Sequence, residues 1–256
     1  MKNFILETKT IFMKKYVNFA SILMVCLMAA SCNTTLYVPN AVNAPLLKEK
    51  GELKASIGFN NFQAAFGLTD HVGVIGNAYW NNFKVDATSN GITSETVNKG
   101  NLYEVGIGYF FNISDNVVFE TYAGGGIGKI DFSNDNSRKY YDVNATKFFI
   151  QPALGYVGKY FDLGFTPRFS AVKYNDLNTS GYTQSELDTE FLNKSAVEDK
   201  TWMFIEPAIT ARFGYKFIKL QAQLGFASKL TDGDLKYESK FSSLGISVNL
   251  AKWYRD

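Results

Sequence analysis

The stretch Leu53-Lys54-Ala55-Ser56-Ile57-Gly58-Phe59 alternates apolar and polar residues with a period of two. Neighbouring side chains of a β-strand point to opposite faces, so this stretch predicts a strand with one apolar face and one polar face. The same alternation returns nine times further along the chain, within residues 62–68, 72–82, 104–111, 117–128, 148–159, 163–170, 203–215, 218–229 and 243–250. We therefore expect an all-β fold of about ten strands.

The connections between the predicted strands are alternately short and long. Short turns are expected at residues 68–71, 113–116, 160–162 and 215–217, and long polar loops at 84–100, 131–145, 175–200 and 230–240. Only the first hairpin, near Asn60-Asn61, breaks this order with a tight turn on the long-loop side. Short turns on one rim and long loops on the other are typical of outer-membrane barrels. The sequence thus predicts an antiparallel up-and-down transmembrane β-barrel, with eight or twelve strands as alternatives to ten.

A soluble barrel would also show alternation, with its apolar face turned inward. Its outer face would need Lys and Glu, whereas the polar faces here hold mainly Gly, Ser and Gln. Aromatic residues also lie near the ends of the predicted strands, where the girdles of a membrane barrel would need them. They are Tyr79, Trp80, Tyr109, Phe111, Tyr160, Phe161, Trp202, Tyr215, Phe217 and Trp253. These features favour the membrane barrel.

The amino-terminal residues 1–31 have the pattern of an export signal. Lys14 and Lys15 precede an apolar run, and small residues precede Cys32. Ala29-Ala30-Ser31-Cys32 is similar to a bacterial lipobox, which predicts a lipid on Cys32; cleavage by an ordinary signal peptidase is the alternative. Residues 32–50 lack a clear period and hold two prolines, so we expect a periplasmic, lipid-anchored tether ahead of a barrel spanning 51–254. With an even strand count, both termini would be periplasmic.

The charge balance argues against a nucleic-acid partner. The formal net charge of the 256 residues is +2, and without residues 1–31 the chain has 22 basic and 23 acidic residues. Nucleic-acid-binding domains usually carry an excess of basic residues. The partners that we expect are outer-membrane lipid and an envelope protein bound through the long outer loops. Cys26 lies in the signal, which leaves Cys32 without a partner for an intramolecular disulfide.

The segment from Phe66 to Val74, Phe-Gly-Leu-Thr-Asp-His-Val-Gly-Val, resembles the periplasmic hairpin of many small outer-membrane barrels. The lead-in Tyr37-Val38-Pro39-Asn40, with Pro45-Leu46-Leu47 and residues 49–52 after it, resembles uncharacterised barrel proteins of the Bacteroidota. This resemblance covers nearly the whole mature chain. It implies location and fold and transfers no active site. Surface lipoproteins of that phylum tend to have acidic residues after the cysteine; Asn33-Thr34-Thr35 departs from this, which suggests a periplasmic anchor.

Few residues suggest catalysis or metal binding. His71 is the only histidine, and it falls in a predicted short turn, where we interpret it as a solvated turn residue. The run Ala123–Lys129 is superficially similar to a phosphate-binding loop but lacks the first glycine and the Ser/Thr after the lysine. We interpret its glycines as thinning a crowded lumen wall. The sequence predicts no catalytic residue, no metal site and no cofactor.

Charged residues on the polar faces of the strands predict a network inside the lumen. They are Lys54, Glu104, Glu120, Lys159, Arg168, Glu206, Arg212 and Lys219. Because small barrels have narrow lumens, opposite charges should pair and close the bore, with Glu206 next to Arg168. The predicted function is that of a structural or partner-binding barrel of the cell envelope with a largely plugged lumen.

Two other functions remain open at this point. One is a narrow, porin-like pore for small solutes. The other is an outer-membrane enzyme that modifies lipid or peptide, for which the predicted outer loops offer acidic residues at Asp176, Glu186, Asp188 and Glu190. The stretch Ser185-Glu186-Leu187-Asp188 is also a candidate cap for a short helix in one of these loops.

Overall fold

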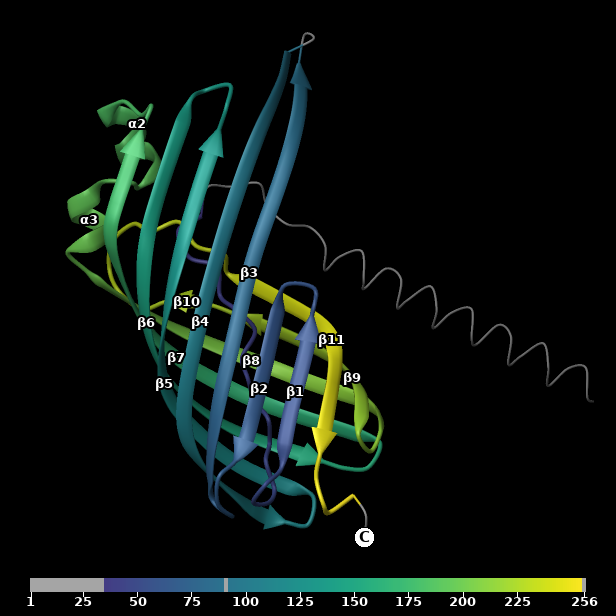
Figure 1. The fold of residues 1–256 in the computed structure, drawn as a ribbon. Helices are drawn as coiled ribbons and strands as arrows, with labels where there is room; N and C mark the ends of the chain where they lie inside the picture. The colour runs from purple at the N-terminus through teal and green to yellow at the C-terminus, as the bar shows by residue number, and fades with distance from the viewer. Residues whose placement is uncertain (1–34, 90–91, 255–256) are drawn as a thin grey trace, which may run out of the picture. The chain divides into compact units, whose positions relative to one another are not determined.

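The computed structural model describes residues 35–89 and 92–254. Its strands are β1 Leu53–Gly58, β2 Asn61–Gly67, β3 Val72–Ser89, β4 Ile92–Ser114, β5 Val117–Asn134, β6 Lys139–Val157, β7 Phe161–Ser180, β8 Thr201–Tyr215, β9 Ile218–Phe226, β10 Ser228–Lys229 and β11 Lys240–Leu250. Two short helices, α2 Gln184–Glu190 and α3 Lys194–Glu198, lie between β7 and β8 (Figure 1).

The strands form one closed antiparallel barrel. From β1 to β9 each strand pairs with the next in sequence, β9 pairs with β11, and β1 closes the barrel by pairing with β11, from Leu53 opposite Leu250 to Gly58 opposite Gly245. The two-residue β10 continues β9 beyond Ala227, and both pair with β8. Counted in this way the barrel has ten strands, which confirms the predicted all-β, antiparallel barrel of about ten strands.

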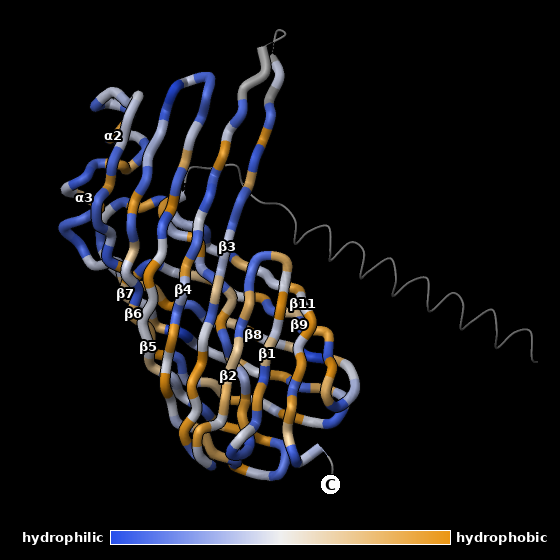
Figure 2. The backbone as a smooth tube through the Cα atoms, viewed as in Figure 1, coloured by the Kyte–Doolittle hydropathy of each residue, from blue (hydrophilic) through white to orange (hydrophobic). Residues whose placement is uncertain are grey.

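Where the outside of the barrel is apolar, the polar side chains of its strands point inward, and buried apolar clusters accompany them. Strand β9 shows this directly, because Lys219, Gln221 and Gln223 are buried while the alternate residues Ile218 and Leu220 are exposed. Apolar residues are concentrated in the part of the barrel near the short connections (Figure 2). In the part of the chain that the structure describes, no helix is long and apolar enough to cross a membrane.

Two of the predicted long loops are largely strand, and a third begins as strand. Residues 84–89 and 92–100 extend the β3–β4 hairpin, 131–134 and 139–145 extend β5–β6, and 175–180 extend β7 (Figure 1). The prediction was wrong here because it followed the apolar outer face, which becomes largely polar along the extensions while the backbone pairing continues. In the β5–β6 extension the alternation persists with its faces exchanged, since Tyr141 and Val143 belong to a buried apolar cluster. A short helix does follow β7, but its cap is Thr183 rather than Ser185.

The aromatic residues divide into two groups. Tyr109, Phe111, Tyr160 and Tyr215 lie near the short connections and make aromatic contacts on the outer face. Trp202 instead faces inward and donates its indole N–H to the carbonyl oxygen of Val197 in α3. Placing Trp202 in a girdle was wrong, because α3 covers this part of the barrel interior and supplies the partner for the indole nitrogen.

The predicted tether is not a free tether where the structure describes it. Residues 35–48, the lumen segment, pass through the inside of the barrel, and nearly all of them are buried. At the rim with the long connections, the Leu36 N–H donates to the carbonyl oxygen of Lys236, and Tyr37 forms a bridge with Tyr237. At the opposite rim, the Lys48 ammonium donates to the carbonyl oxygen of Asp115, in the β4–β5 turn.

The described ends of the chain therefore lie at opposite rims. Residue 35 is at the long-connection rim, whereas the N–H of Trp253 donates to Glu49 at the short-connection rim. The expectation that both termini are periplasmic concerns residues 1–34 and 255–256, which lie outside the described residues, so it stays a prediction. An even number of strands predicts only the rim at which β1 begins. The lumen segment, which precedes β1, runs through the barrel from the other rim.

Candidate functional site

The wall of the lumen holds ten buried charged side chains, five acidic and five basic. They are Glu52, Glu104, Glu120, Asp162 and Glu206, with Lys54, Lys147, Arg168, Arg212 and Lys219. The formal charges cancel, which suits an interior where an unpaired charge is costly.

Seven of the eight predicted lumen charges are in this set. The exception is Lys159, which is exposed in the turn at 158–160, because β6 ends at Val157 and the inward alternation stops there. Sequence reasoning missed Glu52, Lys147 and Asp162. Continuing the alternation of β6 and β7 beyond their predicted starts would have placed Lys147 and Asp162 on the inner face.

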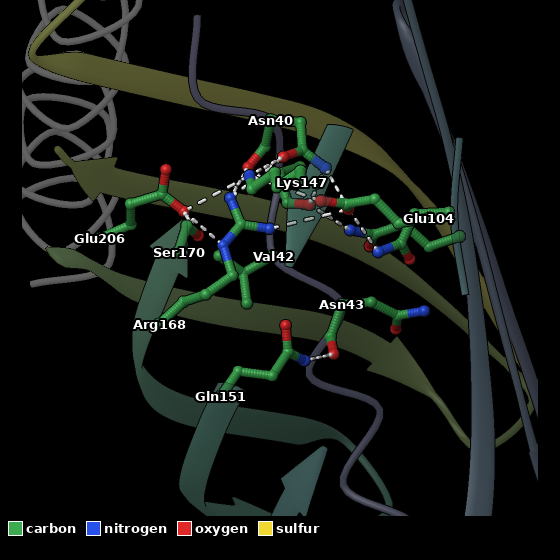
Figure 3. Close-up of polar contacts among 12 residues, drawn as sticks. Asn40, Val42, Asn43, Glu104, Lys147, Gln151, Arg168, Ser170 and Glu206 are labelled. Carbon is green, nitrogen blue, oxygen red and sulfur yellow. Dashed lines mark hydrogen bonds and ion pairs between the residues drawn. The ribbon is translucent and has the colours of Figure 1, made fainter. Parts of the chain in front are cut away.

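Four of the charges form a network in the half of the lumen nearer the long connections (Figure 3). Arg168 of β7 lies directly opposite Glu206 of β8, and its Nε lies 2.5 Å from Glu206 Oε2, so the expected pair is present. The Lys147 ammonium lies 3.4 Å from Glu104 Oε1 and 3.6 Å from Glu206 Oε2. Glu104 Oε2 lies 3.8 Å from Arg168 Nη1.

The lumen segment enters this network through two uncharged side chains. The Asn40 amide donates to Glu104 Oε2 at 2.6 Å, and its oxygen accepts from Lys147 at 3.0 Å and from Arg168 at 3.1 Å. The Tyr37 hydroxyl donates to Glu206. The side-chain amide of Asn40 is therefore hydrogen-bonded to an acidic group and to two basic groups at once (Figure 3).

The other half of the lumen holds the segment through its carbonyl groups. The Lys54 ammonium donates to Pro45 O at 2.6 Å and to Leu46 O at 2.9 Å. Arg212 donates to Ala44 O at 2.7 Å. Lys219 is not near Glu206; its ammonium pairs with Asp162 at 2.6 Å. Glu120 accepts the N–H of Leu47 at 3.3 Å.

Apolar contacts complete the filling of the lumen near the short connections. Leu46 packs with Val118, Ala153 and Val157, whereas Leu47 packs in a second buried cluster that includes Phe110. The glycines of the Ala123–Lys129 run lie in strand β5 and not in a loop. A Cβ at Gly124 would lie 2.6 Å from the ring of Phe149, in agreement with a crowded wall.

The residues considered for catalysis have structural contacts. His71 lies in the turn at 68–71, with its Nδ1 3.2 Å from Phe110 O and its ring stacked on Tyr109. Asp176 contacts Asn144 at 3.1 Å, and Glu190 pairs with Lys236. Asp188 accepts from Gln184 at 3.3 Å, and Glu186 caps α2.

Within residues 35–89 and 92–254, no group of three or more His, Cys, Asp or Glu side chains could hold a metal ion. The predicted lipidation site Cys32 and the predicted signal at 1–31 lie outside the described residues.

The comparisons with known proteins add no function. No model of a known protein family matches the chain, and no curated protein matches it. The strongest functional information is therefore the filled lumen itself.

Proposed function

We propose that this chain is an outer-membrane β-barrel that closes its own lumen with its lumen segment, and that it acts in the envelope as a structural or partner-binding protein. The observation that carries this proposal is the path of residues 35–48 through the barrel. The segment is hydrogen-bonded to the wall from the Tyr37 level to the Leu47 level, so a solute would have to displace it to pass.

The outer surface supports a membrane location. Large apolar side chains such as Val105, Phe148 and Leu220 are exposed around the barrel, and lipid would cover them. The long hairpins and the α2–α3 connection are mostly polar and would project beyond the bilayer (Figure 2). We propose that these projections face the outside of the cell and are the surface that an envelope partner contacts.

Fractionation tests the location. The protein should remain with the outer membrane after carbonate washing and migrate faster on a gel unheated than boiled, because a closed barrel has no unpaired edges. Release by carbonate without detergent would contradict the membrane proposal.

Planar-bilayer recording tests the closed lumen. The full-length protein should show no steady conductance, whereas the double variant Leu46→Ala/Leu47→Ala, which removes side chains that fill the lumen, should show openings. The matched control is Leu220→Ala/Leu224→Ala on the exposed outer face of β9, which should stay closed. Steady conductance of the unmodified protein would contradict the proposal and support the narrow pore.

A further inference from the structure

We propose that the lumen is a binding site for an extended, uncharged peptide, and that it recognises the main chain of its occupant and so accepts a peptide added in trans. The lumen segment is the occupant in this structure. The inference rests on the proposed function, since it takes the closed barrel as its starting state.

Main-chain atoms of four consecutive residues are held by wall side chains from different strands. Gln223 of β9 forms a two-point contact with Val42: it accepts the Val42 N–H at 2.7 Å and donates to the Val42 carbonyl oxygen at 2.8 Å. Gln63 of β2 donates to Ala41 O at 3.1 Å, and Gln151 of β6 donates to Asn43 O at 2.6 Å. Arg212 of β8 donates to Ala44 O at 2.7 Å.

These contacts make few demands on the side chains of the occupant. Ala41, Val42 and Ala44 have apolar side chains, so their hydrogen bonds to the wall come from the main chain alone. Every peptide offers the same N–H and C=O groups, whatever its sequence. Gln63, Gln151 and Gln223 lie on three different strands and together supply the amide donors and acceptors that an extended chain needs.

The charge balance of the lumen limits the occupant to an uncharged peptide. The ten buried charges of the wall cancel one another, and residues 35–47 contain no charged side chain. Because the formal charges of the wall already sum to zero, a charged residue in the middle of the occupant would leave the lumen with a net buried charge, at a high cost in binding free energy.

In the central stretch, the Asn43 side chain also contacts the wall, where its amide donates to Ala64 O at 2.9 Å and to Gly76 O at 3.4 Å. The other side-chain anchors lie on either side of this stretch. Tyr37 and Asn40 bind the charged network on one side, and Leu46 and Leu47 fill apolar space on the other. The site is thus a central stretch held mainly by its main chain between two anchors.

The exchange experiment starts from the complete chain. A protease recognition sequence is inserted between Lys50 and Gly51, which are both exposed, in a turn where Gly51 has φ +78°. The protein is folded intact and then cleaved, so that the lumen segment is held by non-covalent contacts alone. Binding of a fluorescent synthetic peptide of residues 35–48 is then measured by anisotropy.

Three peptides separate main-chain from side-chain recognition. The parent peptide should exchange into the cleaved barrel. A Val42→Ala peptide keeps the N–H but loses two buried methyl groups, so it should bind about tenfold more weakly, and by the same factor in the unmodified and the Gln223→Leu barrel. A peptide N-methylated at Val42 loses the N–H that Gln223 accepts and should bind about tenfold more weakly or worse. In a Gln223→Leu barrel, the parent and the N-methylated peptide should bind alike, which controls for the bulk of the added methyl group.

Two results would overturn the inference. One is an N-methylated peptide that loses as much affinity, relative to the parent peptide, in the Gln223→Leu barrel as in the unmodified barrel, since the loss would then not come from the N–H that Gln223 accepts. The other is a cleaved barrel that binds no labelled peptide, even after prolonged incubation in mild denaturant. Failure of the proposed function is distinguishable, because it would appear as steady conductance of the uncleaved protein.

Discussion

Leu46 of the lumen segment occupies the space that a side chain at position 155 would need. A Cβ built on Gly155 of β6 would overlap both methyl groups of Leu46, and a Cβ on Gly164 would lie 3.3 Å from Leu46 Cδ1. The two glycines face each other across the β6–β7 pair. They form a socket in the wall that holds the Leu46 side chain. A larger residue at either glycine would displace Leu46, and with it the lumen segment.

Gly155→Ala should therefore destabilise the protein. The added methyl group would overlap Leu46 and would lie 2.8 Å from the carbonyl oxygen of Leu163. Overpacking of this kind lowers the free energy of unfolding by about 1–3 kcal/mol. Urea unfolding followed by tryptophan fluorescence measures the difference. Gly76→Ala is the matched control, because a Cβ there meets no atom within 4 Å. Equal midpoints for the two variants would show that Leu46 does not occupy the socket.

Glu206→Ala should be far more costly than the loss of an exposed carboxylate. It removes the partner of Arg168 in a dry network, and stranding one member of a buried pair costs about 3–5 kcal/mol in the free energy of unfolding. Glu95→Ala breaks a 3.0 Å pair with Lys84 that is open to solvent and should cost about 0–1 kcal/mol. Small and equal effects of the two substitutions on the urea midpoint would indicate a wet, open lumen and favour the narrow pore.

The carboxylate of Glu186, in the first turn of α2, should stay ionised in acid. Hydrogen bonds from the Lys139 ammonium and from the Thr183 N–H and hydroxyl lower the pKa of Glu186 to about 2. Since the folded pKa lies below the ordinary value of 4.5, the contribution of the charged carboxylate to the stability of α2 is complete above pH 4.5 and disappears as the pH falls through about 2.

Carboxyl NMR titration of Glu186 measures this pKa directly. Removing the first donor by Lys139→Ala should raise the pKa of Glu186 towards its ordinary value, whereas Lys84→Ala, in a different hairpin, should leave it unchanged. An unshifted Glu186 in the unmodified protein would contradict the capping contacts.

Cys32 should carry lipid if the lipobox similarity reflects processing. Metabolic labelling with a fatty-acid analogue should mark the mature protein, and Cys32→Ala should abolish the label. Unlabelled parent protein, or label that persists in the variant, would instead support cleavage by an ordinary signal peptidase.

The alternation of apolar and polar residues was enough to predict the barrel, because successive side chains of every strand in a closed sheet point alternately outward and inward. In β11, Leu244, Ile246 and Val248 face outward, and Ser247 and Asn249 face inward, as their alternation predicts. The same rule predicted the Arg168–Glu206 pair from strand order. It failed at Lys147, where the sequence pattern did not show how far β6 extends.

The sequence by itself determined the strand alternation, the polar lumen and the presence of a non-strand segment before Gly51. Only the tertiary structure decided that this segment fills the lumen and leaves it at the opposite rim. Val42 and Gln223 are far apart in sequence, and their contact uses main-chain groups that every residue has, so no residue type indicates it in advance. Local alternation follows from the geometry of a single strand, whereas the position of the lumen segment depends on β2, β6, β8 and β9 meeting around it.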